Sequence, residues 1–484
     1  GYGGIGLRFY PPTAYYVLAF GKILMGDWFT ASCLAFLFWT ILGGFGVYFL
    51  AREFADEKSA FVGAVLYLFA PYHATELYGA FMYAEFAAAA ILPFCFLFLT
   101  RIINKNNVSD IFGLAISIAA LIFTHLPLSV IGILSFAVYT LFALKKENFF
   151  RLSAKVSLGV LLALAASSFQ WIKVLTEMKW LNHASEKFSA ADFYDYRENF
   201  LLSFKYLAGL ENDIHSMWFF DLLLLFTLII ALPFAVVFYK NASIELKNKL
   251  KSAKVLAIFT FFIFTPLSIL LWNYISVLQK VQFPWRFLSV FTICAVVFVA
   301  SGFEIALSFA KTKQRPIFLM LCGCLFVGIA FTYSQVIKQA LFIPPNEFVK
   351  TTENLASAPN HEEWLSVWAK KEAAEIGGNV LSARKNEIKE WNSTKKVFKL
   401  AEGKEETARI GLFYYPHWQA EINGLKAEIK PAEDGAMLVK IPAQESIVKL
   451  EFVEPKIVKI SIYVSILSWI FLIAAFLQTR FKFI

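Results

Sequence analysis

Apolar runs close to twenty residues long constrain the fold of this chain more than any other feature of its sequence. A helix needs about 20 predominantly apolar residues to cross the hydrocarbon core of a bilayer. Runs near this length lie at 29–50, 60–78, 81–99, 111–124, 127–144, 156–171, 218–239, 255–272, 287–309, 316–333 and 457–477. The sequence therefore predicts a polytopic α-helical membrane protein with about eleven transmembrane helices, of which the shorter ones are tilted or shielded by their neighbours.

The composition and the charge agree with a membrane chain and argue against a nucleic-acid partner. Hydrophobic residues make up 58% of the 484 residues, and 53 residues are Phe, whereas a soluble domain is about 45–50% apolar. The net charge of +9 comes from short loops between apolar runs, where basic residues set the membrane topology. All five cysteines fall in apolar runs, so we expect no disulfide framework. Cys322 and Cys324 have no His or acidic residue nearby, which favours buried thiols over metal ligands.

The distribution of Lys and Arg predicts which loops face the cytoplasm. Basic residues fill the segments 145–155, 240–254 and 311–315 and the chain end at 480–482. Cytoplasmic loops carry an excess of Lys and Arg, and strict alternation then places 52–58 and 101–105 on the same side. The opposite face receives the N-terminal loop and the segments 71–80, 173–217, 273–286 and 343–456. We therefore expect a multi-pass protein of the plasma membrane.

The segment 343–456 is the only sizeable stretch outside the membrane, and it divides the chain into three parts. We expect a multi-helix membrane domain at 1–342, an extracytoplasmic α+β or β-sandwich domain at 343–456, and a C-terminal transmembrane helix at 457–484. The middle part begins with helical character at 346–375. Alternating residues then predict short strands at 397–400, 410–415, 420–422 and 447–452. Asn423-Gly424 predicts a two-residue hairpin turn. Because the chain opens within a loop, we also expect a helix upstream of Gly1.

The stretch QFPWRFL at residues 282–288 is the most distinctive candidate site. It places Gln282, Trp285 and Arg286 just before a long apolar run, and Pro284 suits the turn that leads into a helix. We expect Arg286 at the lip of that helix, where a guanidinium can meet water or a lipid phosphate. The alternative is a membrane anchor whose charged end reaches the interface.

Further polar residues fall at the predicted outer ends of helices. They are His73, Glu76, Tyr78 and Glu85 around one inter-helix turn, His125 at the end of another helix, and Tyr10 in the N-terminal loop. A carboxylate there is suited to act as a general base or to bind a divalent cation. Glu85 has the alternative of pairing with a Lys or Arg on a neighbouring helix, and Glu76 that of a solvated loop acid. The two histidines have the alternative of interfacial residues with satisfied hydrogen bonds. The loop 173–217 carries more candidates: Glu177, His183, Asp192, Asp195 and His215.

Other site types find no support in the sequence. Gly1–Gly6 matches the glycine spacing of a dinucleotide site, but no strand precedes it and no helix opens where one should. No metalloprotease helix motif, P-loop, nucleophile elbow or paired CxxC is present. We therefore predict no resident metal site from a motif, and leave open whether a divalent cation takes part.

Three groups of residues resemble a family of bacterial membrane proteins known as pyruvoyl-tetrahydropterin synthase-related. They are Tyr10-Pro11-Pro12, then Ala70-Pro71-Tyr72 with Glu76, Tyr78 and Glu85, and then QFPWRFL. That family in turn resembles the GT-C superfamily of glycosyltransferases, which use polyprenyl-phosphate sugars. Trp418 and the Asn423-Gly424 hairpin are similar to the outer domain of related proteins that decorate lipoteichoic acid with sugar.

The resemblance implies transfer of a sugar, outside the cytoplasm, from a polyprenyl-phosphate donor to a cell-envelope acceptor. In that superfamily an acidic residue of the first outer loop is the expected catalytic group, and that position would lie upstream of Gly1. Arg286 and Gln282 match the family motif, and phosphate recognition is our inference from their chemistry. Our candidates are Glu85 and Glu76 as catalytic residues, and as substrate-binding residues Arg286, Gln282, Trp285, Tyr10, Tyr78, His125 and His73.

Two other functions remain open at this point. A transporter or flippase of lipid-linked sugars would place charges at mid-membrane within inverted repeats, whereas this chain keeps its charges at helix ends and has no obvious repeat. A non-catalytic membrane scaffold that displays the predicted β domain is the third possibility. It would be favoured by a first outer loop without any acidic residue.

Overall fold

The computed structural model describes residues 6–78, 82–143, 146–182, 195–203, 214–339, 343–355, 364–370 and 379–481. The chain divides into two compact units, each discontinuous in sequence. The β unit comprises Gly1–Tyr10, Ser168–Ala191 and Glu353–Ser465, and the membrane unit comprises Pro11–Ser167, Asp192–Thr352 and Ile466–Ile484. Two segments that the sequence analysis assigned to the membrane domain, 1–10 and 168–191, are thus grouped with the β strands.

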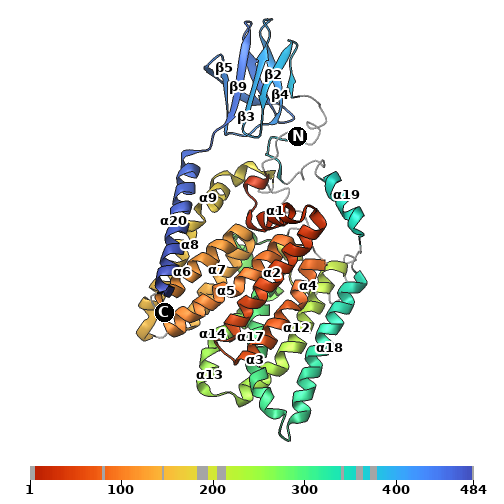
Figure 1. Ribbon diagram of the computed structural model, residues 1–484, viewed down its shortest axis with the longest axis vertical. Coiled ribbons are helices and arrows are strands. Elements are labelled where there is room, and N and C mark those ends of the chain that lie inside the picture. Colours follow the sequence, from red (N-terminus) through yellow and green to blue (C-terminus); the bar gives the residue numbers. More distant parts are fainter. Residues whose placement is uncertain are drawn as a thin grey trace. The chain divides into compact units, whose positions relative to one another are not determined.

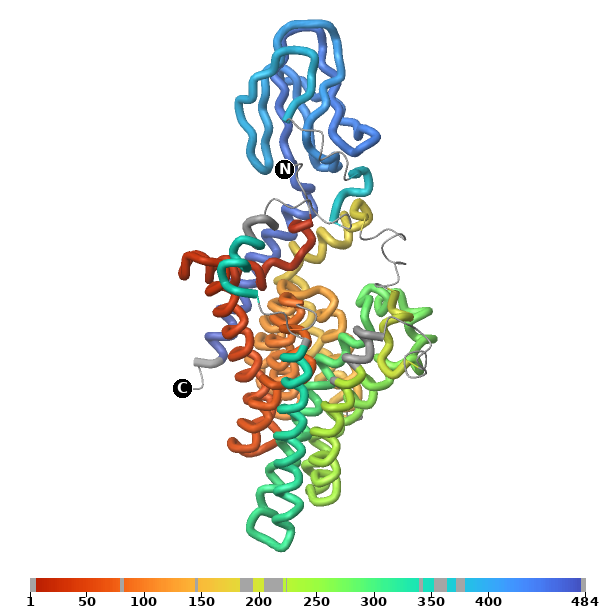
Figure 2. The backbone as a smooth tube through the Cα atoms, turned by 90° about the vertical axis from the view of Figure 1, so that its right-hand side faces the viewer, coloured from red at the N-terminus to blue at the C-terminus, as the bar shows by residue number. Residues whose placement is uncertain are grey.

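Helices make up the membrane unit (Figures 1 and 2). In chain order they are α1 (Thr13–Met25), α2 (Trp28–Ala51), α3 (Glu57–Leu68), α4 (Pro71–Tyr78), α5 (Tyr83–Lys105), α6 (Val108–Thr124), α7 (Leu126–Ala143), α8 (Phe149–Ala166), α12 (Ile214–Asn241), α13 (Ile244–Lys249), α14 (Lys251–Ile263), α15 (Ile269–Tyr274), α16 (Ser276–Gln279), α17 (Leu288–Phe309), α18 (Arg315–Gln339) and α19 (Pro345–Leu355). The last three residues of α19, 353–355, belong to the β unit, and the helix α20 (Lys456–Phe481) begins in the β unit and ends in the membrane unit.

Within the described residues, eight helices are long and apolar enough to cross a membrane. A ninth span results if α14 and the segment Pro266–Tyr274, which meet at an angle of 85°, are counted together. The prediction of a polytopic α-helical membrane protein is therefore confirmed, whereas the count of about eleven stays a prediction. The predicted run 60–78 is divided into α3 and α4 just before Pro71, because the residue before a proline is disfavoured in helical geometry.

The helices α5 and α17 lie at the centre of the membrane unit. About 78% of the apolar window of each is buried, compared with 17% for α20 and 22% for α18. Small residues allow this packing. A Cβ atom on Gly302 of α17 would lie 2.4 Å from the backbone oxygen of Phe234 in α12. Only glycine permits this approach, so the sequence of α17 sets how closely α12 can pack against it.

The β strands form two antiparallel sheets. The strands are β1 (Val380–Leu381), β2 (Asn386–Trp391), β3 (Lys395–Leu400), β4 (Glu406–Phe413), β5 (Trp418–Ile422), β6 (Leu425–Ala427), β7 (Ile429–Pro431), β8 (Ala436–Ile441) and β9 (Ser446–Phe452). One sheet has the order β1-β4-β8-β7 and the other β2-β3-β9-β5-β6. Alternate residues of both sheets, among them Phe398 and Met437, share one apolar core. This is a sandwich, as the alternating pattern predicted.

The hairpin turn lies where the sequence predicted it. Asn423 and Gly424 join β5 to β6 with φ values of 50° and 82°, the positive values of a type I′ turn. The helical prediction for 346–375 is confirmed only in its first part, by α19. The described residues 364–370 form no continuous helix. They contain an isolated β-bridge between Ser366 and Leu181. Leu181 follows α9 (Ser168–Glu177) and the 3-10 turn Met178–Trp180.

Candidate functional site

A buried ion pair joins the two central helices at one end of the membrane unit. Glu85 lies in the first turn of α5, and Arg286 lies in the 3-10 turn Pro284–Phe287 that leads into α17. Nε of Arg286 donates to Oε2 of Glu85 at 2.8 Å, and the two residues are only 6% and 1% exposed. The sequence analysis expected Arg286 at the start of a helix, where the structure has it; its side chain is nearly enclosed, and contact with a lipid phosphate stays a prediction. Glu85 thus pairs with an Arg of a neighbouring element, which was the alternative to a functional role.

Both carboxylate oxygens of Glu85 have neighbours. The hydroxyl of Tyr72 donates to Oε1 at 2.6 Å. Nε2 of His125 lies 3.9 Å from Oε2. Because Nδ1 of His125 accepts from the backbone N–H of Leu128 at 3.3 Å, the neutral imidazole carries its proton on Nε2, which faces the carboxylate. His125 is thus a buried residue with a satisfied ring nitrogen, beside the ion pair.

The stretch QFPWRFL holds the guanidinium of Arg286 from several sides. Nη1 donates to the backbone oxygen of Val281 at 2.7 Å and contacts Oε1 of Gln282 at 3.4 Å. The guanidinium lies 4.6 Å from the ring centre of Phe283, which stacks on Trp285 at 5.2 Å. Gln282 has a φ of 69°, an uncommon value for a residue other than glycine. Nη2 of Arg286 forms no hydrogen bond with a described residue.

A second acid–base pair lies on α4. Nδ1 of His73 and Oε2 of Glu76 are 2.9 Å apart, and the residues are 4% and 2% exposed. The alternative of Glu76 as a solvated loop acid is therefore wrong, because the residue lies on a buried helix rather than in an open turn. Among the described residues, neither Nε2 of His73 nor Oε1 of Glu76 has a hydrogen-bond partner. Buried polar atoms are seldom left unpaired, so these two atoms require an explanation.

The other predicted site residues are distributed more widely. Tyr78 ends α4 and is 56% exposed. Trp285 is buried, and its indole N–H lies 3.4 Å from Oδ1 of Asn199. Tyr10 belongs to the β unit, where its ring lies 5.8 Å from that of Trp364. His183, Asp192 and the side chain of His215 lie outside the described residues.

An ion network in the β unit was not predicted as a unit. Arg8 donates to both oxygens of Glu177, at 2.7 and 2.9 Å, and to both oxygens of Glu454, at 2.5 and 2.7 Å. The hydroxyl of Tyr415 donates to Glu177 at 2.7 Å, and Nε2 of His417 lies 3.2 Å from it. The network ties the N-terminal segment to α9 and to the chain that leaves β9.

The electrostatics of this network favour an ionised Glu177. Burial opposes ionisation, but the hydrogen bonds from Arg8 and Tyr415, together with the nearby imidazole of His417, outweigh it and lower the pKa of Glu177 to about 2. The sequence analysis named Glu177 only as one of several loop acids. Its partners Arg8 and Tyr415 lie 169 and 238 residues away in the chain, so no local sequence pattern predicts these pairs.

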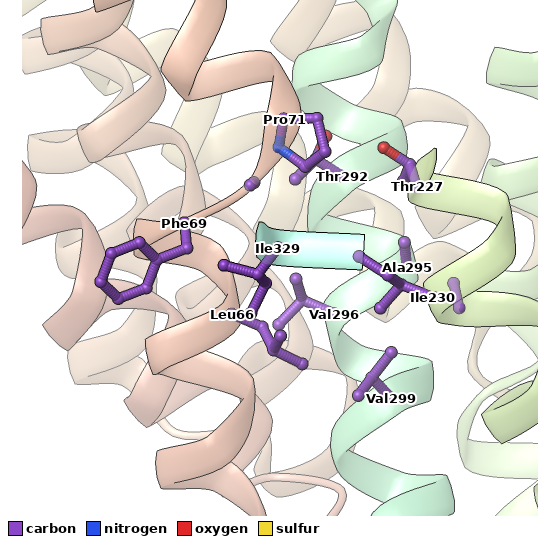
Figure 3. A pocket seen from close by; sticks show the side chains of 12 residues that line it. Leu66, Phe69, Pro71, Thr227, Ile230, Thr292, Ala295, Val296, Val299 and Ile329 are labelled. Carbon is purple, nitrogen blue, oxygen red and sulfur yellow. The ribbon is translucent and has the colours of Figure 1, made fainter. Parts of the chain in front are cut away.

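An apolar groove in the membrane unit is lined by residues of five helices (Figure 3). Its cavity volume is about 30 Å³. The lining residues come from α3, α4, α12, α17 and α18, and include Leu66, Phe69, Pro71, Thr227, Thr292 and Val296. Pro71 precedes Tyr72 in the chain, and Thr292 follows Arg286 by six residues. The groove thus adjoins two of the elements that carry the cluster.

Comparisons with known proteins identify a family. A family model described as 6-pyruvoyl-tetrahydropterin synthase related domain, membrane protein, matches residues 7–337, more than half of the chain. The matched range contains every residue of the buried cluster around Glu85 and Arg286. No curated protein and no solved structure matches the chain.

Proposed function

We propose, for a chain that belongs to the 6-pyruvoyl-tetrahydropterin synthase related family of membrane proteins, the function of a GT-C-type glycosyltransferase. In this proposal it transfers a sugar from a polyprenyl-phosphate donor to an acceptor of the cell envelope. The observation that carries the proposal is the guanidinium of Arg286, held at one end of the helix bundle with Nη2 unoccupied by any described residue.

The setting of Arg286 is suited to a phosphate. Its orientation is held by Glu85, Val281 and the ring of Phe283, so little side-chain entropy remains to be lost on binding. A guanidinium offers several N–H groups in one plane and grips a phosphate better than an ammonium does. A phosphate that contacts Nη2 would add a charge-assisted hydrogen bond without displacing the pair with Glu85.

The apolar groove supports a lipid as the carrier of that phosphate. Thr292 lies roughly 9 Å along the helix axis from Arg286, at about 1.5 Å per residue. The groove wall is almost wholly aliphatic or aromatic, which matches the isoprenoid chain of a polyprenyl phosphate.

The membrane topology that goes with this function places the β unit outside the cytoplasm. The basic loops support it, because Arg101 and Lys105 lie at the end of α5 opposite to Glu85 and pair there with Glu53. Protease added to intact cells should then cut within 343–456. Cleavage in 240–254 with protection of 343–456 would reverse the topology and remove the cell-envelope acceptor from the proposal.

One observation favours a second candidate function. Ionisable residues buried within membrane helices often mark proton pathways in transporters, and His73, Glu76, Glu85 and Arg286 are such residues. A proton-coupled transporter or flippase of lipid-linked sugars is therefore the rival. Its signature would be proton-dependent movement of the lipid across a sealed vesicle, without release of the sugar from its phosphate.

The test of the proposal compares Arg286, which pairs with Glu85 of α5, with Arg101 of α5, which pairs with Glu53. Arg286→Lys keeps the charge but loses the planar fork, whereas Arg101→Lys makes the same change at the pair with Glu53. Hydrogen bonds to charged groups contribute about 1.5–3 kcal/mol, so Arg286→Lys should weaken binding of a polyprenyl-phosphate sugar roughly tenfold to a hundredfold. Arg101→Lys should have no effect.

The binding experiment, in nanodiscs, includes the uncharged polyprenol as a second ligand. The wild-type protein should prefer the phosphate, and Arg286→Lys should reduce that preference while polyprenol binding stays unchanged. If the variant lost binding of both ligands together, its fold would be damaged. Equal phosphate preference in the wild-type and Arg286→Lys proteins would refute phosphate recognition by Arg286.

A further inference from the structure

The buried end of the membrane unit contains more acidic groups than permanent cations. Glu76 and Glu85 are both enclosed, and Arg286 is the permanent cation that reaches them among the described residues. Arg286 contacts Glu85 at 2.8 Å, so this pair is electrically neutral. An ionised Glu76 would leave one uncompensated negative charge in a low-dielectric region, which is strongly unfavourable. A neutral cluster therefore needs one additional proton.

The surroundings of Glu76 restrict where this proton is held. Tyr67 of α3 packs on His73 with ring centres 4.4 Å apart, and Phe86 of α5 lies 6.0 Å from the same ring. The hydroxyl of Tyr72 donates to Glu85. Nδ1 of His73, 2.9 Å from Oε2 of Glu76, is therefore the nearest basic group.

We propose that His73 and Glu76 form the proton-accepting pair of the site and share one proton between Oε2 of Glu76 and Nδ1 of His73. We assign Glu85 the part of a positioning residue for Arg286. The assignment deepens the glycosyl transfer proposed above, and its chemical step rests on that function. The protonation of the pair does not, because it follows from the charges and the burial alone.

The contacts separate the parts played by the two carboxyl groups. Both oxygens of Glu85 are engaged, Oε1 by Tyr72 and Oε2 by Arg286. Oε1 of Glu76 and Nε2 of His73 are enclosed and have no partner among the described residues. A base must offer a free lone pair to the proton that it takes. Glu76 meets this condition, and Glu85 does not.

The step is balanced in atoms and charge. The oxygen of the acceptor hydroxyl forms a bond to the anomeric carbon, and the bond from that carbon to the phosphate oxygen breaks, with its electron pair leaving on the polyprenyl phosphate. The hydroxyl proton passes to Oε1 of Glu76, while the proton on Oε2 passes to Nδ1 of His73. The pair ends as a neutral carboxylic acid beside an imidazolium, which later releases its extra proton to solvent.

The first test is infrared spectroscopy of the full chain in nanodiscs at neutral pH, without any substrate. The wild-type protein should show the band of a protonated carboxylic acid that disappears in Glu76→Gln. The matched control Glu53→Gln, at a carboxylate paired with Arg101 and Lys105, should retain the band. A spectrum in which Glu76→Gln removes no such band would overturn the shared proton.

The second test is the rate of sugar transfer. General acid–base catalysis contributes typically 10²–10⁴-fold, so Glu76→Gln should lower kcat at least a hundredfold with KM for the donor little changed. His73→Gln should shift the pH profile of kcat. Glu85→Asp, which keeps the charge but displaces the partner of Arg286, should instead raise the donor KM.

These outcomes separate the inference from the proposed function. A folded Glu76→Gln protein with wild-type kcat would refute the base, whatever the infrared result. If the wild-type protein transfers no sugar but the infrared band behaves as described, the proposed function fails and the proton-sharing pair stands.

Discussion

At the scale of single residues, burial changes the roles that can be assigned to the candidate site residues. Arg286, Glu85, His73, Glu76 and His125 were found from their types and from their positions at helix ends. Their pairing was not predictable, because Glu85 and Arg286 are 201 positions apart and a single sequence carries no information on which distant residues meet. The sequence therefore predicted the members of the cluster but not which carboxylate keeps one oxygen without a partner among the described residues.

Glu177 supplies a prediction on pH that belongs to this scale. Its pKa is lowered to about 2 from the ordinary 4.5, so its contribution to stability is complete above about pH 4.5 and is lost as the pH falls toward 2. The shift corresponds to at most about 3 kcal/mol. Unfolding of the β unit, followed by the susceptibility of 379–452 in the full chain to a protease, should become easier over this window.

Variants identify the residue responsible for the pH effect. Glu177→Gln should abolish most of this pH dependence and lower the stability at pH 7. The control Glu428→Gln removes an exposed carboxylate that pairs with Lys430 and should leave the curve unchanged, since exposed pairs contribute little. If the stability of the Glu177→Gln protein depended on pH as steeply as that of the wild-type protein, the network with Arg8 would not depend on this carboxylate.

At the scale of elements, apolar run lengths predicted most helices and failed where a run contains a break. The run 60–78 became α3 and α4, and the run 255–272 became α14 and a second segment at 85° to it. Pro71 and Pro266 stand at these two breaks and are the signal available in the sequence. In the β unit, the alternating residues and the Asn423-Gly424 turn were sufficient, because hairpin geometry is a local property of the chain.

The packing of α12 on α17 supplies the prediction for this scale. Gly302→Ala would place a Cβ atom 2.4 Å from the backbone of Phe234, and such overpacking costs typically about 1–3 kcal/mol. Gly323→Ala on α18 is the matched control, because no atom lies within 4 Å of its Cβ position. There the change should be neutral or stabilise the helix by up to about 1 kcal/mol.

The measurement is thermal unfolding of the two variants in the same detergent. The melting temperature should fall in Gly302→Ala and should not fall in Gly323→Ala. Equal melting temperatures would mean that α12 and α17 can move apart to accommodate the added methyl group, and would contradict the prediction.

At the scale of the whole molecule, the sequence predicted a membrane chain with a β sandwich near its C-terminal end. It did not predict that the segments 1–10 and 168–191 belong with that sandwich. The reason is physical, since Arg8 reaches Glu454 across 446 positions and chain order says nothing about such contacts. Family membership covers residues 7–337, so the sandwich lies outside the matched range.

The central claim is that this protein cleaves the bond between a sugar and a polyprenyl phosphate. The most direct measurement follows release of polyprenyl phosphate from a labelled polyprenyl-phosphate sugar by the full-length protein in nanodiscs with a cell-envelope extract as acceptor. We predict release in equal amount to the sugar transferred, at a rate at least a hundredfold lower in Glu76→Gln and preserved in Glu53→Gln. An intact donor under these conditions, together with its proton-dependent movement across sealed vesicles, would contradict the claim and identify a transporter.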